Sequence, residues 1–238
     1  MTDSILKLKE MVCSSDNIVF FGGAGVSTES GIPDFRSVDG LYNQKYKYPP
    51  EQILSRSFFE ANPEEFFRFY REKLVFTDVK PNAAHFKLAE LERAGKLKAV
   101  ITQNVDGLHR EAGSKNVLEL HGSRYRGYCT RCGKNYPGEH MINAEGVPLC
   151  DCGATVRPDV VLFEESLNDE TLRAAIRCIS EADVMIVGGT SLAVYPAAGL
   201  VNYYKGDKLA LINRDPTPYD KHADIVIHDS IGHVFSQI

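Results

Sequence analysis

The sequence predicts an α/β fold built on a doubly wound, parallel, Rossmann-like sheet. Short apolar runs rich in Val, Ile and Leu recur along the 238 residues without strict alternation, as expected of strands that are buried on both faces. Helical patterns separate these runs, and strands that alternate with helices form parallel sheets. The predicted strands are Asn17–Phe21, Ala99–Thr102, Val117–Leu120, Val160–Phe163, Val184–Val187, Lys208–Ile212 and Asp224–Ile227.

Two of the intervening helices have recognisable ends. Pro81 and Asn82 open the first helix and Gly95 closes it, since Pro and Asn are common at helix starts and Gly just beyond helix ends. Asn168 starts the second helix. The predicted apolar faces are Ala84, Leu88 and Leu91 in the first helix, and Leu172, Ala175, Ile176 and Ile179 in the second.

Two segments interrupt this rhythm and predict insertions into the sheet domain. Phe58–Phe76 is crowded with aromatic side chains, which more often form core than a binding site. Cys129–Cys152 is polar, contains Gly and Pro, and has no long apolar period. We therefore predict one domain over residues 1–238. Its Rossmann-like part covers about 1–35, 77–122 and 158–238, its helical insertion about 36–76, and a small module about 123–157.

The composition is that of an ordinary globular protein, and it limits the choice of partner. Apolar residues make up 43% of the chain and charged residues 25%. The net charge of −5 argues against a specific nucleic acid partner. The chain has no run of about eighteen apolar residues, so no membrane span is predicted. The N-terminus lacks the apolar core of a signal peptide. We expect a cytoplasmic monomer, with Cys13 and Cys178 as buried apolar residues.

Four cysteines form two close pairs with seventeen residues between the pairs. Four thiolates in this spacing suit a tetrahedral structural zinc site. Each pair precedes a glycine, Gly133 or Gly153, which lets the chain turn so that backbone amides point at sulfur. The alternatives are two disulfides, which a reducing cytoplasm disfavours, or four unrelated thiols. A zinc ion with four protein ligands has no open position, so we predict one structural Zn²⁺. The ligands are Cys129, Cys132, Cys150 and Cys152.

A glycine cluster, Gly22–Ser27, directly follows the first predicted strand. Such clusters let backbone amides approach a pyrophosphate, although this one departs from the G-x-G-x-x-G spacing and alone also fits a plain tight turn. The continuation through Ser37 is a poor helix and a poor strand, so we predict a loop. Within that loop Phe35 can cover a flat ring and Arg36 can oppose phosphates. The whole run favours a loop that binds a ligand.

The residues Gly23–Ser27 together with Gly31–Ser37 resemble the signature of the sirtuins, the NAD-dependent protein lysine deacylases. Further matches follow in the expected order, and the resemblance extends from about Val12 to about Phe235. These matches are Thr102–Asp106, His121-Gly122, the cysteine pairs and Gly189–Leu192. The tight second cysteine pair, and Glu164 where many relatives have glycine, resemble variants of bacterial members.

The resemblance implies that NAD binds at the carboxyl ends of the strands, where open α/β sheets bind ligands. Gln103 would bind ribose hydroxyls, and Asp106 with the backbone of Val105 would bind the nicotinamide carboxamide. Asn104 would help to position nicotinamide for cleavage, although Asn at this place also fits a helix N-cap. The other implied NAD contacts are Gly23, Ala24, Gly25, Thr28, Phe35, Arg36, His121, Gly189, Thr190, Ser191, Asn213, Ser230 and Ile231.

His121 ends a predicted strand and precedes Gly122. A lone histidine is usually structural, but this position fits a general base. The resemblance implies that His121 activates a ribose hydroxyl after the acyl oxygen has displaced nicotinamide, with Asn104 and Asp106 as the other catalytic residues. The implied products are free lysine, nicotinamide and O-acetyl-ADP-ribose.

The resemblance also implies that an acetylated protein segment pairs with Val160, Val161, Leu162 and Phe163 as an added strand. Relatives that prefer succinyl groups carry a Tyr-x-x-Arg pair where this chain has Phe67 and Tyr70. Because an apolar pocket without a cation cannot neutralise a carboxylate, we expect acetyl to be preferred over succinyl.

Two alternatives remain at this stage. The first is an NAD glycohydrolase or mono-ADP-ribosyltransferase on the same fold, which would not need the later step of His121. The second is a non-catalytic zinc-ribbon module that reads nucleic acid, which the acidic net charge disfavours.

Overall fold

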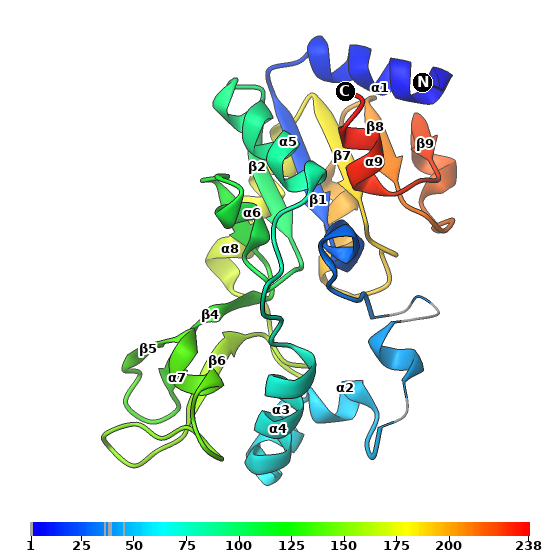
Figure 1. Cartoon of the computed structure of the whole chain (residues 1–238). Helices are drawn as coiled ribbons and strands as arrows, with labels where there is room; N and C mark the ends of the chain where they lie inside the picture. The colour runs from blue at the N-terminus through cyan, green and yellow to red at the C-terminus, as the bar shows by residue number, and fades with distance from the viewer. Residues whose placement is uncertain (1, 36, 38–39, 45) are drawn as a thin grey trace.

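The computed structural model describes residues 2–35, 37, 40–44 and 46–238, and it contains the predicted parallel sheet (Figure 1). All neighbouring strands in this sheet are parallel, in the order β3-β2-β1-β7-β8-β9. This is the Rossmann order, and it reverses between β1 and β7, the place where such sheets bind ligands. The strands are β1 (Ile18–Gly22), β2 (Leu97–Thr102), β3 (Val117–Glu119), β7 (Val184–Gly188), β8 (Leu209–Ile212) and β9 (Ile225–Ile227).

Helices cover both faces of the sheet (Figure 1). One buried cluster joins the sheet to α1 (Asp3–Cys13), α5 (Ala83–Arg93) and α9 (Ile231–Phe235). A second cluster, on the other face, contains α8 (Asp169–Glu181) and the 3₁₀ helix Ala197–Tyr203. The two helices with predicted ends are confirmed, because Asn82 and Asn168 cap them as expected and Gly95 has a left-handed φ of 76°.

The remaining elements form a second body below the sheet in Figure 1. It combines the helices α2 (Pro50–Ile53), α3 (Arg56–Ala61), α4 (Pro63–Lys73) and α7 (Gly138–Ile142) with an antiparallel sheet. That sheet has the order β5-β4-β6 and comprises β4 (Gly122–Cys129), β5 (Asn135–Pro137) and β6 (Val156–Val160). The short helix α6 (Leu108–Glu111) and the 3₁₀ segments Ala24–Val26, Thr28–Ser30, Leu41–Asn43 and Asp220–His222 complete the described elements.

One aromatic core holds this second body together. Phe59, Phe66 and Phe67 lie in ring contact, with centroids 5.0–6.0 Å apart. The same buried cluster includes Cys129 and Met141 from the region around β4 and α7. The prediction that the aromatic segment forms core is confirmed. The two segments that look separate in the sequence share a single hydrophobic core in the structure.

Two expectations about apolar residues are wrong. Val160–Phe163 is not a strand of the parallel sheet, because Val160 ends the antiparallel strand β6 and the next three residues lie outside any strand. A run of only four apolar residues shows no hydrophobic periodicity. The sequence alone therefore does not distinguish a buried strand from the wall of a cleft. Cys13 is exposed at the end of α1 and is not buried, whereas Cys178 is half-buried. Among the described helices, none is long and apolar enough to cross a bilayer.

Two histidines, one from α5 and one from α6, are buried side by side. His85 and His109 are 0% and 2% exposed, and their ring centroids lie 4.7 Å apart. Burial lowers the pKa of His85 to about 4 and that of His109 well below its usual value. The Nδ1 atom of His85 accepts the backbone N–H of Asn82 at 3.2 Å, so protonation at this atom would remove part of the cap of α5.

We expect the free energy of unfolding to fall as the pH decreases from about 6.5 towards 4. In this range the unfolded chain binds protons on both imidazoles and the folded chain does not, so protonation favours unfolding. Urea unfolding at several pH values measures the effect. A His109→Leu variant should lose less stability than the parent over the same range, and parallel stability curves for the two proteins would contradict the assignment.

Candidate active site and metal centre

The loop after β1 packs directly on the loop after β7, where the strand order reverses. The backbone N–H of Gly25 donates to the Gly189 carbonyl at 2.8 Å. A Cβ atom on Gly25 would lie 2.8 Å from Gly189 Cα, and one on Gly189 would lie 2.4 Å from the backbone nitrogen of Val26. Gly189 also has a left-handed φ of 59°. Glycine is therefore required at both positions by loop packing, whatever ligand the loops bind.

A buried serine links the glycine-rich loop to the polar residues after β2. Ser27 is 0% exposed, and its hydroxyl donates to Asp106 Oδ2 at 2.7 Å. The amide of Asn104 donates to the same Ser27 oxygen at 3.1 Å. The other carboxylate oxygen of Asp106 accepts the backbone N–H of Leu108 at 2.9 Å. The side chains of Asn104 and Asp106 are thus held in fixed positions.

Ser27 is a site residue that was missing from the sequence prediction. Its only signal was its place inside the glycine-rich run, where a serine also fits an ordinary turn. Asn104 is not a helix N-cap, because Gly107 occupies that position in α6.

His121 follows the carboxyl end of β3 and directly precedes β4. A backbone contact defines the tautomer of its imidazole ring. Its Nδ1 atom lies 2.9 Å from the Gln103 carbonyl oxygen. A carbonyl oxygen only accepts hydrogen bonds, so Nδ1 carries the proton and Nε2 has the free lone pair. Burial lowers the pKa of His121, an effect that the backbone contact to Gln103 partly opposes. The neutral form, which can accept a proton, is therefore favoured near neutral pH.

A cleft of about 380 Å³ brings most of the predicted site residues together between the two bodies. This volume is within the range of small-molecule sites. The predicted residues that line it are Gly23, Ala24, Gly25, Phe35, Gln103, Asn104, Val105, Asp106, His121, Val160, Val161, Leu162, Phe163, Gly189, Thr190, Ser191 and Asn213. Gln103 also donates to the Thr190 hydroxyl at 3.1 Å, which joins the loops after β2 and β7.

Four predicted cofactor residues are not placed in this cleft. Arg36 lies outside the described residues. Thr28 donates through its hydroxyl to the Gly25 carbonyl at 3.1 Å and does not line the described cleft. Ser230 donates through its hydroxyl to the carboxylate of Glu29 at 3.0 Å, and Ile231 is buried in the cluster between the sheet and α1, α5 and α9. The structure gives no support for an NAD contact by these last two residues.

Carboxylates outnumber cations around the cleft. Its lining, as far as the chain is described, contains Asp34, Asp106, Glu164, Glu165 and Asp215 and no Lys or Arg. Phe67 and Tyr70 are 0% and 1% exposed, inside the aromatic core and not on the cleft wall. They therefore do not form the pocket surface that the sequence comparison assigned to them.

Nearby cations are held elsewhere. Arg68 binds Glu65 and Glu72 on the outer side of α4. Arg71 donates to the Met141 carbonyl at 3.0 Å and to the Gly146 carbonyl. Neither guanidinium lines the described cleft.

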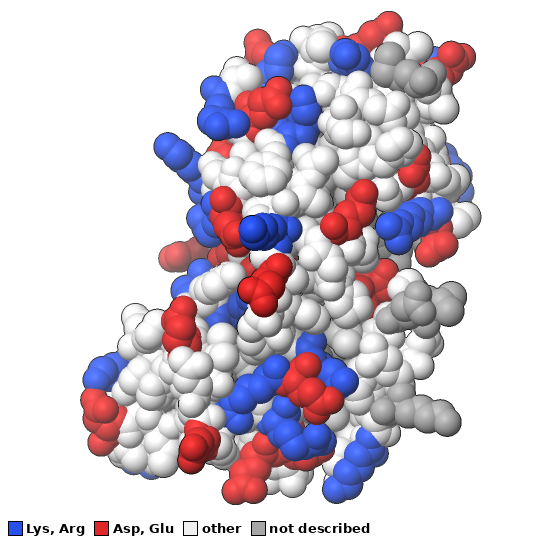
Figure 2. Space-filling model, in the orientation of Figure 1, with Lys and Arg blue, Asp and Glu red and all other residues white. Residues whose placement is uncertain are grey.

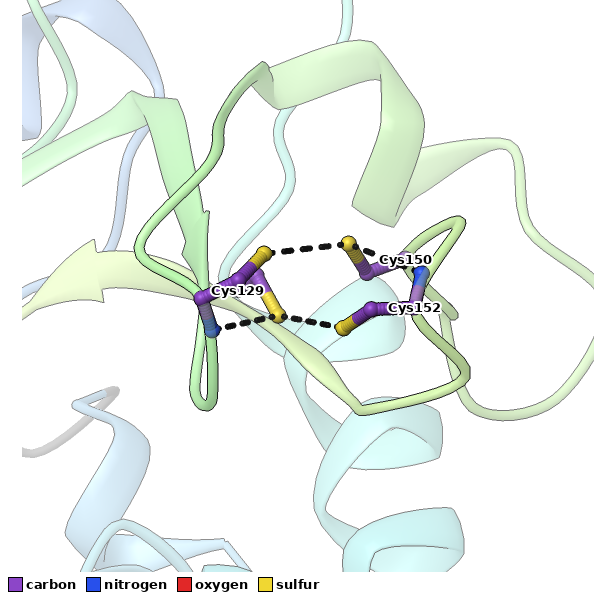
Figure 3. Close-up of side chains that lie close together, drawn as sticks. Cys129, Cys150 and Cys152 are labelled. Carbon is purple, nitrogen blue, oxygen red and sulfur yellow. Dashed lines mark hydrogen bonds between the residues drawn. The ribbon is translucent and has the colours of Figure 1, made fainter.

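The four predicted metal ligands converge in the second body, with Cys129 facing Cys150 and Cys152 across two loops (Figure 3). All four sulfur atoms lie within 4.8 Å of one another, with 3.5 Å between Cys129 and Cys152 and 3.6 Å between Cys132 and Cys150. A tetrahedron of sulfurs around zinc has edges of about 3.8 Å, from a Zn–S distance of about 2.3 Å. The spacing fits zinc, and it is too long for disulfides, whose S–S distance is about 2.0 Å.

Backbone amides support the thiolates as the sequence predicted. The N–H of Cys132 donates to Cys129 Sγ at 3.4 Å, and the N–H of Cys152 donates to Cys150 Sγ at 3.5 Å. Gly133 and Gly153, with φ of 71° and 79°, provide the turns that follow, and these turns aim the amides of Lys134 and Ala154 at the sulfur atoms of Cys132 and Cys152. The four residues supply a complete tetrahedral set, so this centre would hold shape and leave no position for substrate.

Known proteins resemble this chain over its whole length. A model of the Sir2 family matches residues 23–196. NAD-dependent protein deacetylases of Clostridium acetobutylicum and Clostridium perfringens are each 59% identical to it over 242 residues, covering 100% of this chain and 99% of theirs.

A solved Sir2 structure with a p53 peptide and NAD⁺ is 41% identical, with a TM-score of 0.88, covering 100% of this chain and 97% of that one. A Sir2 structure bound to an acetylated peptide is 40% identical with the same TM-score and the same coverage.

Removal of zinc should disorder the second body, since two of the ligands, Cys129 and Cys150, belong to its aromatic core. A Cys129→Ser variant should lose metal and near-ultraviolet circular dichroism from its Phe and Tyr side chains. Zinc analysis and thermal melting measure both effects, with Cys13→Ser as the matched control at an exposed cysteine. Active protein without zinc, or a Cys129→Ser variant with the parent melting temperature, would contradict a structural metal.

Proposed function

The chain belongs to the Sir2 family of NAD-dependent protein deacetylases, and we propose that it transfers the acetyl group of N6-acetyl-lysine to ADP-ribose with His121 as the general base. The observation that carries the base assignment is the contact between His121 Nδ1 and the Gln103 carbonyl. This contact leaves Nε2 as the proton acceptor in the cleft that would bind NAD and peptide.

The residues around His121 would divide the remaining work. Bound NAD supplies the ribose carbon to which the acetyl oxygen adds as nicotinamide leaves. Asp106, fixed by Ser27 and the Leu108 amide, would hold the carboxamide, and Asn104 would orient the ring for departure. The glycine-rich loop and Thr190 would contact the phosphates and ribose through amides and hydroxyls. His121 would take the proton from a ribose hydroxyl at Nε2.

Acetylated lysine side chains of proteins are the proposed substrates, with Val160, Val161, Leu162 and Phe163 as the peptide-binding wall. These residues line the cleft, and the N–H of Val161 donates to the His121 carbonyl at 3.0 Å. A cytoplasmic location fits four thiols kept as metal ligands, because a reducing compartment preserves them.

The alternatives receive less support. A glycohydrolase or ADP-ribosyltransferase would release nicotinamide without an equal amount of deacetylated peptide, so measuring both products decides between them. Lys and Arg side chains are interspersed with Asp and Glu on the face shown in Figure 2, and the described cleft lining is acidic. Neither feature supports a nucleic acid partner.

Replacing His121 by Ala should lower deacetylation by about 10²–10⁴-fold, the usual loss for a general base. The dissociation constant for NAD should stay close to the parent value, because the base acts after cofactor binding. Product formation and NAD binding are measured on the same preparations. A variant that keeps more than a few per cent of activity would show that another group takes the proton.

The pH profile of the parent enzyme gives a second check on the same residue. Since burial lowers the pKa of His121 from 6.5, the neutral base persists below that value. The acid limb of kcat/KM should therefore lie below pH 6.5, and a limb above it would contradict the assignment.

Acetyl groups should be removed well ahead of succinyl groups, because the described lining offers no cation to a carboxylate. A Leu74→Arg variant places a guanidinium on this lining and should raise desuccinylation relative to deacetylation by about tenfold or more, as for one charge-assisted contact. Leu74→Met is the neutral control. Peptide panels read by mass spectrometry test both, and equal parent rates on the two acyl groups would refute the preference.

A further inference from the structure

Glu164 has a backbone conformation that side chains rarely adopt. Its φ is 76°, in the left-handed range. Among the described residues other than glycine, only Asp78 and Leu192 also have a φ in this range. The residue lines the cleft, directly after the proposed peptide-binding wall. A strained residue persists only when surrounding contacts hold it, and at a functional site it indicates a specific role.

The carboxylate of Glu164 holds the start of helix α3. Its Oε2 atom accepts the backbone N–H of Ser57 at 2.9 Å, and its Oε1 atom accepts the Ser57 hydroxyl at 2.9 Å. The preceding residue takes part as well, because the Phe163 carbonyl accepts the N–H of Arg56 at 3.0 Å. Two N–H groups in the first turn of α3, which lack partners within the helix, are therefore bound by residues 163 and 164.

The same segment reaches the catalytic histidine through its backbone. The N–H of Phe163 donates to the Leu54 carbonyl at 2.9 Å, just before α3. The N–H of Val161 donates to the His121 carbonyl at 3.0 Å. Residues 161–164 are thus tied to the helical part of the second body at one end and to His121 at the other.

We propose that Glu164 is a positioning residue that fastens the peptide-binding wall to α3 and thereby presets the acetyl-lysine site beside His121. This inference rests on the proposed deacetylase function. Without the Glu164–Ser57 contact the wall would have more conformations to lose when the peptide binds, so the peptide would bind more weakly. Once the peptide is bound, the geometry at His121 would be restored and the chemical step would change little.

A Glu164→Gly variant isolates this role, because glycine keeps a positive φ without strain and loses both contacts to Ser57. We expect the KM for an acetylated peptide to rise about fivefold or more, with kcat and the KM for NAD within about twofold of the parent. Glu164→Gln should restore the peptide KM to within about twofold of the parent, since its amide oxygen still accepts the Ser57 N–H. Asp78→Gly, at an exposed residue with φ of 62°, is the matched control and should leave the peptide KM unchanged.

A double-mutant cycle tests whether the effect passes through Ser57. Ser57→Ala alone should raise the peptide KM, and adding it to Glu164→Gly should raise it no further. If the parent protein deacetylates the peptide and the Glu164→Gly variant has the same KM for it, the proposal is overturned. Additive effects of the two substitutions would also overturn it. Failure of the parent itself to produce deacetylated peptide would instead refute the proposed function.

Discussion

The backbone contact between Gly25 and Gly189 is the constraint on which the cleft depends. It joins the loops after β1 and β7 at the point where the strand order reverses. The two loops lie so close together that neither glycine has room for a Cβ atom. Ser27 follows in the same loop, and its hydroxyl fixes Asp106 and Asn104 at the end of β2. Thr190 binds Gln103 from the other loop. A larger residue at either glycine would separate the loops and shift Ser27 and Thr190, the residues that bind Asp106, Asn104 and Gln103.

A second constraint comes from the core that the helical insertion and the cysteine module share. Rings of α3 and α4 pack against Cys129, Cys150 and Met141, so the metal centre and the aromatic helices stabilise each other. Neither segment is large enough to bury a core of its own, and small bodies of this kind depend on added cross-links or metals. A structural role of this kind is consistent with four metal ligands that do not belong to the described cleft lining.

The sequence was informative wherever a local rule determined the structure. Strand periodicity, helix caps and cysteine spacing gave the sheet, α5, α8 and the metal centre, because each depends on residues close together in the chain. It failed where a distant contact decides the outcome. The role of Ser27 depends on Asp106, 79 residues away, and the run Val160–Phe163 forms a cleft wall because Leu54 and His121 bind its backbone. Phe67 and Tyr70 illustrate the same limit, since the aromatic pattern predicted their core position correctly, whereas the alignment also assigned them to an acyl pocket whose described lining they do not join.

His121 lies where the two bodies meet, and this location accounts for its chemistry. β3 brings it from the parallel sheet, and β4, which starts at Gly122, belongs to the second body. Its ring is bound by the Gln103 carbonyl on the sheet side, while its own carbonyl binds Val161 on the other side. Both bodies therefore hold this residue, and partial burial of the imidazole favours the neutral form that a general base requires. Strand β4 runs from Gly122 to the predicted metal ligand Cys129, so the segment that follows the base leads directly into the metal centre.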